Sequence, residues 1–129
     1  MDNDRDGRGV GLADFDRDGL LDFYQANAGQ PSLFYRGATA KAGHWVEVKL
    51  VGTRSNRDAI GARLTLAAGG ATQIREVNGS NSYASQASLR LHVGLGAATH
   101  VDSAVVRWPS GRVESFALAV DRISVLVEG

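Results

Sequence analysis

The 129-residue sequence contains no cysteine, only two prolines and no net charge at pH 7. Without cysteine the chain has no disulfide bond, no thiolate nucleophile and no cysteine-ligated zinc. Zero net charge argues against a chain-wide nucleic-acid surface, because such modules usually carry a basic excess. No apolar stretch approaches the roughly 18 residues of a membrane-spanning helix, so we expect no membrane span. The first ten residues lack a signal pattern, so we expect any export signal to lie outside this chain.

Hydrophobic residues make up 43% of the chain and occur mostly in short segments that alternate with polar residues. This period of two predicts β-strands, and no stretch of 12 residues shows a convincing helical period. We expect strands at residues 10–15, 20–26, 45–51, 62–68, 72–77, 89–95, 101–108, 112–118 and 122–127. The predicted fold is therefore all-β: an antiparallel β-sandwich or sandwich-like barrel, preceded by a β-hairpin.

The strand at residues 45–51 illustrates the pattern. Val46, Val48 and Leu50 share one face, which we expect to be buried. Glu47 and Lys49 share the other face, which we expect to be solvated.

The balanced charge is unevenly distributed. Residues 1–22 contain seven aspartates and three arginines, a formal charge of −4, and the remaining 107 residues carry +4. Carboxylates this close repel one another, so the acidic segment needs either water or a cation around it.

The most informative motif is D-F-D-R-D-G-L-L-D, from Asp14 to Asp22. Counted from Asp14, carboxylates stand at positions 1, 3, 5 and 9, and a glycine at position 6 permits a sharp turn. Alternate carboxylates in a tight turn suit Ca²⁺, which takes about six to eight oxygen ligands. Gln25 replaces the closing glutamate of an EF-hand, so we expect a calcium turn within a hairpin, with a solvated acidic turn as the alternative. The predicted ligands are the carboxylates of Asp14, Asp16, Asp18 and Asp22 and the backbone carbonyl of Leu20.

A second motif, D-N-D-R-D-G, provides Asp2, Asp4 and Asp6 as candidate ligands for another ion. It has no carboxylate at the position where Asp22 closes the first motif, because Val10 stands there. A solvated terminus is the alternative interpretation.

Two resemblances cover most of the chain. The stretch GVGLADFDRDGLLDFYQAN is similar to one VCBS/FG-GAP repeat, the calcium-loop unit of a propeller blade. Four motifs in order resemble the ASPIC/UnbV domain that follows such repeats: HWVEVKLVGTRSNRDAIGARLTL, QIREVNGSNSYASQ, LRLHVGLG and VDSAVVRWPSG. We therefore expect a partial calcium-loop segment at residues 1–36, a linker at 37–43 and an ASPIC/UnbV-like β domain at 44–129.

The resemblance implies an extracellular or periplasmic module that binds calcium in the repeat and acts in adhesion or recognition. It supplies no catalytic residues. The sequence itself also predicts no catalytic site, because it has no nucleophile-elbow motif and its three histidines lack metal-ligand spacing.

Two loops are candidates for ligand contact. Arg54 and Arg57 could bind an anion in a bidentate manner, although a structural network is an equally physical reason for such a loop. Tyr83, in the polar stretch 78–86, could stack on a sugar, or the stretch could be a hydrogen-bonded crossover.

We therefore expect a non-catalytic, calcium-binding β module of an exported protein. Its predicted partner is a protein or glycan on a cell surface or matrix, and we expect no nucleic acid. Two alternatives stay open: a carbohydrate-binding module, and an assembly element that forms homo-oligomers by strand addition.

Overall fold

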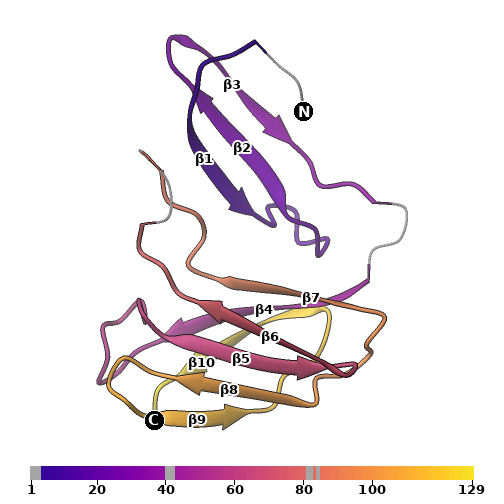
Figure 1. Ribbon diagram of the computed structural model, residues 1–129, viewed down its shortest axis with the longest axis vertical. Helices are drawn as coiled ribbons and strands as arrows, with labels where there is room; N and C mark the ends of the chain where they lie inside the picture. Colours follow the sequence, from indigo (N-terminus) through magenta and orange to yellow (C-terminus); the bar gives the residue numbers. More distant parts are fainter. Residues whose placement is uncertain (1–3, 40–42, 81–82, 84) are drawn as a thin grey trace. The chain divides into compact units, whose positions relative to one another are not determined.

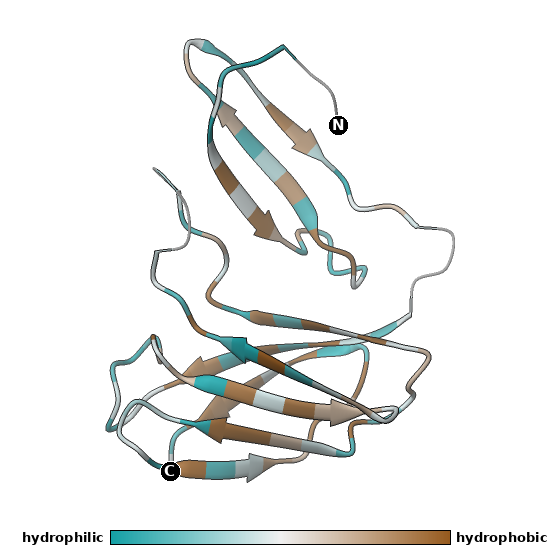
Figure 2. Cartoon of the chain, in the orientation of Figure 1, coloured by the Kyte–Doolittle hydropathy of each residue, from teal (hydrophilic) through white to brown (hydrophobic). Residues whose placement is uncertain are grey.

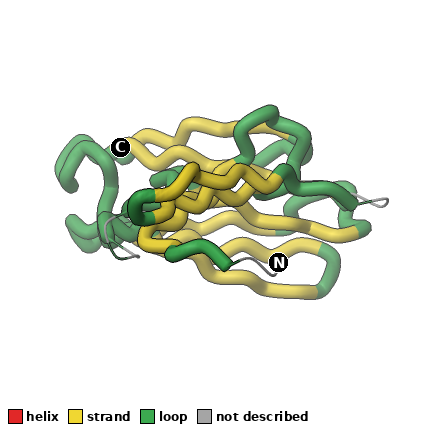
Figure 3. Tube along the Cα trace, turned by 90° about the horizontal axis from the view of Figure 1, so that it is seen from above, coloured by secondary structure: helices red, strands yellow, loops and turns green. Residues whose placement is uncertain are grey.

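The computed structural model describes residues 4–39, 43–80, 83 and 85–129. Within these residues the chain forms ten β-strands and no helix, which confirms the all-β prediction (Figures 1 and 3). The described residues accordingly contain no helix of the length and apolarity that crossing a membrane requires. The chain divides into two compact units, which we call the N-terminal unit (Met1–Ala40 with Gly79–Ser88) and the C-terminal unit (Lys41–Asn78 with Leu89–Gly129).

The N-terminal unit contains a three-stranded antiparallel sheet in the order β1-β2-β3 (Figure 1). Its strands are β1 (Gly7–Ala13), β2 (Asp22–Asn27) and β3 (Gln30–Tyr35). The predicted hairpin thus has a third strand, because the apolar residues before Arg36 extend along β2. Phe23 pairs with Tyr35 in register, and their ring centroids are 5.7 Å apart. Aromatic cross-strand pairs of this kind stabilise a sheet.

The segment Gly79–Ser88 belongs to the N-terminal unit although its neighbours in sequence belong to the other unit. The Val10 N–H donates a hydrogen bond to Ser85 Oγ at 3.0 Å. The Ser88 N–H donates to the Leu12 carbonyl at 3.4 Å. Ser85 and Ser88 therefore contact β1, which explains why this segment groups with the N-terminal unit. This grouping was not part of the linear division expected from the sequence.

The C-terminal unit is a β-sandwich without a closed barrel. One sheet has the order β10-β4-β7 and contains β4 (His44–Val51), β7 (Leu91–Gly96) and β10 (Arg122–Val127). The other has the order β6-β5-β8-β9 and contains β5 (Arg63–Ala68), β6 (Ala71–Glu76), β8 (Ser103–Arg107) and β9 (Val113–Phe116). Every pair is antiparallel except β10 with β4, which is parallel. The last strand can add in that direction because no tight turn joins it to β4.

The hydrophobic core lies between these two sheets. Hydrophobic and hydrophilic residues alternate along the strands, as Figure 2 shows for the C-terminal unit. On β5, for example, Leu64 and Leu66 are 0% and 1% exposed, whereas Arg63 is exposed. The buried hydrophobic residues form one cluster: Val46, Val48, Leu50, Ala59, Ala62, Leu64, Leu66, Ala68, Val77, Leu91, Val93, Leu95, Ala104, Val106, Trp108 and Leu126. Each large member contributes about 1.5–3 kcal/mol relative to an exposed position.

Glu47 is an exception to the predicted alternation. It is only 3% exposed, whereas its partner in the prediction, Lys49, is exposed as expected. β4 is the central strand of its sheet, and Glu47 lies in register between His92 on β7 and Ile123 on β10. Arg90 Nη1 lies 3.6 Å from Glu47 Oε2 and offsets part of its charge. The prediction that Glu47 is solvated was therefore wrong. A period of two assigns residues to one face of a strand but does not determine how exposed that face is.

Candidate functional site

The turn between β1 and β2 is shaped by the carboxylates of its own aspartates. Asp14 is buried, and its two oxygens accept hydrogen bonds from the N–H groups of Asp18 and Gly19 at 3.1 and 2.9 Å. Gly19 has a φ of 89° and Arg17 a φ of 63°, both in the left-handed region. Glycine occupies such conformations without strain, which is the physical reason for glycine at position 6 of the motif.

Asp22 has a different role from the other aspartates of this turn. It is 1% exposed, and its Oδ2 accepts a hydrogen bond from the Phe15 N–H at 2.9 Å. Its Oδ1 accepts from the Gly37 N–H at 2.8 Å. A Cβ on Gly37 would lie 2.7 Å from the Leu21 carbonyl oxygen, so only glycine fits here without a shift. Asp22 therefore ties the start of the turn to the segment after β3.

Three of the predicted ligands converge in space. One carboxylate oxygen from each of Asp14, Asp16 and Asp18 can be chosen so that all three lie within 4.8 Å of one another. The Arg36 guanidinium contacts this cluster, with Nη2 at 2.5 Å from Asp16 Oδ2 and at 3.5 Å from Asp18 Oδ2. Arg36 also lines an adjacent pocket with Asp18, Leu20, Gly37, Ala38 and Thr39. Sequence reasoning missed Arg36 because β2 and β3 separate it from the motif along the chain.

The donor set fits a hard divalent cation. Three carboxylates bring a formal charge of −3, and Arg36 supplies only one positive charge beside them. Each carboxylate oxygen has two lone-pair positions, so an oxygen that accepts one backbone N–H can still bind a cation. Oxygen donors of this kind suit both Ca²⁺ and Mg²⁺. Asp22 and the Leu20 carbonyl stay predicted additional ligands.

The second acidic motif lies only partly within the described residues. Asp2 is outside them. Asp6 is exposed and forms an ion pair with Arg8 at 2.7 Å, and its N–H donates to Gln30 Oε1 at 2.9 Å. A second ion at Asp2, Asp4 and Asp6 stays a prediction.

The loop with Arg54 and Arg57 is organised by a residue from the other end of the C-terminal unit. Glu128 is 2% exposed, and its Oε2 accepts hydrogen bonds from the N–H groups of Thr53, Arg54 and Ser55 at 2.7–2.9 Å. Its Oε1 accepts from the Ser55 and Ser110 hydroxyls. Burial alone would raise the pKa of Glu128, but the bonds from Ser110 and from the three N–H groups outweigh it and lower the pKa to about 2.

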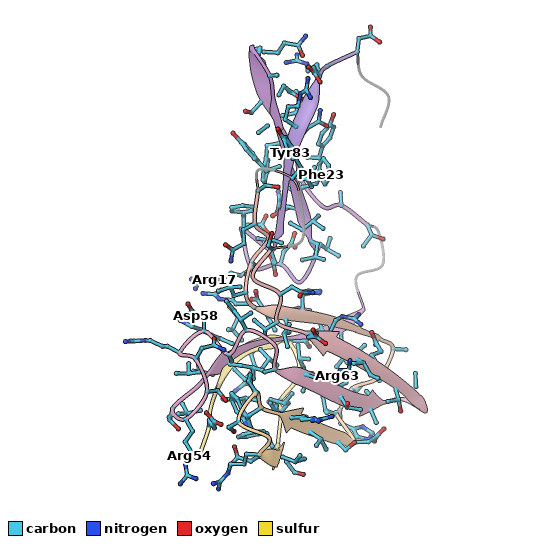
Figure 4. All side chains as sticks on the ribbon, turned by 60° about the vertical axis from the view of Figure 1, so that its left-hand side comes forward. Arg17, Phe23, Arg54, Asp58, Arg63 and Tyr83 are labelled. Carbon is cyan, nitrogen blue, oxygen red and sulfur yellow. The ribbon has the colours of Figure 1, made fainter. Side chains whose placement is uncertain are left out.

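Arg54 and Arg57 are exposed, and neither forms an ion pair or side-chain hydrogen bond with any described residue. Figure 4 shows Arg54 extending away from the strands. Their loop is held through its backbone by Glu128. No sequence pattern indicates this role of Glu128, because its hydrogen-bond partners at residues 53–55 and 110 are distant along the chain. Anion contact by Arg54 and Arg57 stays a prediction.

Tyr83 lies in the N-terminal unit and is 76% exposed (Figure 4). The stretch 78–86 that surrounds it, in which residues 81, 82 and 84 lie outside the described part, bonds to β1 through Ser85. Both the hydrogen-bonded crossover and sugar stacking by Tyr83 stay predictions.

Together these features define the class of protein: an all-β module with one sandwich and one small sheet that carries a cluster of carboxylates. Residues 52–129 match the ASPIC and UnbV family, and the chain belongs to that family. The ASPIC/UnbV resemblance is thereby confirmed. The match begins after the acidic turn, so the resemblance of that turn to an FG-GAP repeat stays a prediction.

The chain is also similar to three curated proteins. Cartilage acidic protein 1 of Mus musculus is 30% identical over 129 residues, covering 95% of this chain and 20% of that protein. Cartilage acidic protein 1 of Homo sapiens is 30% identical, with 95% and 19% covered, and that of Xenopus tropicalis is 28% identical, with 95% and 20% covered. The chain spans about a fifth of the length of these relatives.

Proposed function

We propose that the chain is a non-catalytic recognition module of an exported protein, extracellular or periplasmic, whose Asp14–Asp22 turn binds Ca²⁺. Its partner is a protein or glycan at a cell surface or in a matrix. The observation that supports calcium binding is the convergence of the Asp14, Asp16 and Asp18 carboxylates with a single arginine beside them. The match to the ASPIC and UnbV family supports the recognition role, because the resemblance to that family implies adhesion or recognition.

The bound ion would be structural. The three carboxylates repel one another in the absence of a cation, and Arg36 offsets that repulsion only in part. Ca²⁺ would complete the compensation and hold the turn that connects β1 to β2. Arg36 would then be free to move toward the solvent or the adjacent pocket. Calcium-poor and calcium-rich surroundings would therefore differ in how well this turn is ordered.

Calcium dependence can be measured on the full chain by calorimetric titration and by hydrogen–deuterium exchange. Extracellular calcium modules bind with a Kd of about 0.1–1 mM. At about 10 mM Ca²⁺, such a site stabilises the bound form by roughly 1.4–2.7 kcal/mol. We expect slower exchange in residues 10–25 when Ca²⁺ replaces chelator, with little change in the C-terminal unit.

The test variant is Asp16→Asn, and its matched control is Asp58→Asn, which removes one exposed carboxylate from the C-terminal unit. Asp16→Asn should weaken calcium binding about tenfold or more, whereas Asp58→Asn should leave it unchanged. The proposal is wrong if the wild type shows no heat of calcium binding and the same exchange with calcium as with chelator.

A further inference from the structure

A pocket in the C-terminal unit lies apart from every residue discussed above as a predicted ligand. It has a volume of about 270 Å³ and is lined by Gly61, Arg63, Glu76, Arg107, Trp108, Pro109 and Gly111. Pockets for drug-sized ligands have about 300–1,000 Å³, so this one suits a ligand the size of a single ring. All its residues belong to one unit, and Figure 4 marks Arg63 on the β5 strand.

Two arginines of this pocket stand directly opposite each other. Arg63 on β5 pairs in register with Arg107 on β8, and on its other side Arg63 pairs with Glu76 on β6. Like charges in directly opposed positions destabilise a sheet. Glu76 Oε2 lies 3.3 Å from Arg63 Nη2 and compensates that charge. Arg107 has no ion pair or side-chain hydrogen bond with any residue in the described ranges. The row Glu76–Arg63–Arg107 therefore keeps one excess positive charge.

The remaining wall of the pocket is a hydrogen-bonded turn. The Trp108 N–H donates to the Arg112 carbonyl at 2.8 Å, and the Gly111 N–H donates to the Trp108 carbonyl at 2.9 Å. Trp108 is 1% exposed, and its ring packs against Phe116 with centroids 6.5 Å apart. The turn that carries Pro109 is thus anchored in the core, and the wall is formed before any ligand arrives.

The lining combines three chemical properties: a guanidinium available for an anion, a carboxylate that can accept from a hydroxyl, and the apolar ring of Pro109. Arginine binds carboxylate and sulfate groups in a bidentate manner. We propose that this pocket binds an acidic sugar residue, with its carboxylate or sulfate at Arg107, a hydroxyl at Glu76 and its C–H face on Pro109. The site does not depend on the calcium turn, because none of its residues lies in the N-terminal unit.

The binding test is a titration of the ¹⁵N-labelled full chain, followed by NMR. The probes are glucuronate, glucose 6-sulfate, neutral glucose and sodium sulfate. We expect glucuronate and glucose 6-sulfate to shift the backbone amide signals of Arg107, Trp108, Ser110 and Gly111 saturably and more weakly at high salt, and glucose to leave them unchanged. No saturable shift with either acidic sugar would overturn the proposal, as would equal binding of glucose. Sulfate that binds as well as glucose 6-sulfate would overturn the sugar assignment and leave an oxyanion site only.

Three variants assign the binding to these residues. Arg107→Gln should weaken acidic-sugar binding about tenfold or more, because it removes a charged hydrogen-bond donor. Arg122→Gln removes one exposed arginine from β10, outside the pocket, and should bind like the wild type. Glu76→Gln replaces the charged acceptor for the sugar hydroxyl with a neutral one and should reduce the preference for glucose 6-sulfate over free sulfate, because only the sugar contacts Glu76. Thermal melts confirm that each variant is folded. Unchanged binding in Arg107→Gln, or an unchanged preference for glucose 6-sulfate over sulfate in Glu76→Gln, would contradict the site.

Discussion

The C-terminal unit contains all the fully buried hydrophobic side chains of the described residues, whereas those of the N-terminal unit are at least partly exposed. Among the described residues of the N-terminal unit the buried polar side chains are Asp14 and Asp22, and each oxygen of both carboxylates accepts one backbone hydrogen bond. Phe15 and Phe34 contact each other there, yet they are 61% and 53% exposed.

The two units therefore obtain their order from different sources. The sandwich is stabilised by burial of apolar surface. This contribution to stability is large and does not require a bound ion. The small sheet relies on polar contacts within a turn whose charges are incompletely compensated, so its order should depend on pH, ions and single hydrogen bonds. The sandwich also contains a buried carboxylate that accepts backbone hydrogen bonds, Glu128. There the hydrogen bonds add to the stability that the hydrophobic core already provides.

The largest effect should come from the core of the sandwich. Leu64→Ala creates a cavity at a side chain that is 0% exposed, so we expect a loss of about 3 kcal/mol in the free energy of unfolding. Leu12→Ala is the matched variant in the N-terminal unit, where the side chain is 42% exposed, and should cost less than about 1 kcal/mol. Urea unfolding followed by tryptophan fluorescence measures the loss caused by Leu64→Ala directly, because Trp45 and Trp108 both lie in the C-terminal unit. Equal losses would contradict the distinction between the units.

The next effect concerns Glu128. Its pKa is about 2 in the folded chain against an ordinary 4.5, so the unfolded chain takes up the proton first as the pH falls. The stability that Glu128 supplies is therefore complete above pH 4.5 and is lost progressively toward pH 2. Glu128→Gln should lower the melting temperature at neutral pH by several degrees, because it removes a charged acceptor of backbone and hydroxyl hydrogen bonds, and should flatten the pH dependence below 4.5. Asp58→Asn, at an exposed position, serves as the control. If the melting temperature of Glu128→Gln depended on pH as that of the wild type does, Glu128 would not be the source of the pH dependence.

Asp22 and Asp16 separate hydrogen bonding from cation binding in the N-terminal unit. Asp22→Asn weakens the bonds from the Phe15 and Gly37 N–H groups, so without calcium we expect a loss of roughly 1–2 kcal/mol in the local stability of the sheet. The loss should be larger with calcium, because Asp22 is also a predicted ligand. Asp16→Asn should reduce that stability only when calcium is present, because without calcium the substitution relieves repulsion among the three carboxylates. Hydrogen–deuterium exchange of β2 provides the measurement for both variants. An Asp22→Asn chain that exchanges like wild type would show that the hydrogen bonds from Phe15 and Gly37 to Asp22 do not stabilise the sheet.

The smallest effects concern the backbone of the acidic turn. Gly19→Ala places a Cβ at a φ of 89° and should destabilise the turn by about 1 kcal/mol. Arg17→Gly relieves a left-handed arginine at a φ of 63° and should stabilise it by up to about 0.5 kcal/mol. Opposite changes in the exchange of β1 and β2 are expected, and changes of the same sign would contradict the argument from φ.

The strands and the turn were predictable because both depend on residues close together in sequence. Alternation at 62–68 identified β5 and its buried Leu64 and Leu66, since neighbouring side chains on a strand point to opposite faces. The spacing of Asp14, Asp16 and Asp18 identified three carboxylates that converge, because a turn with glycine at position 6 returns alternate side chains to one point. These are consequences of local backbone geometry.

Contacts between distant segments were not predictable. No local pattern connects the residues of three such contacts. These are the ion pair of Arg36 with Asp16, the hydrogen bonds from residues 53–55 to Glu128, and the hydrogen bond from Val10 to Ser85. The same holds for Arg63 and Arg107, which become neighbours only when β5 pairs with β8. The sequence by itself thus determined the strands other than β3, the family and the acidic turn. Only the tertiary structure decided which charges are compensated, because compensation depends on which strands and loops the fold brings together.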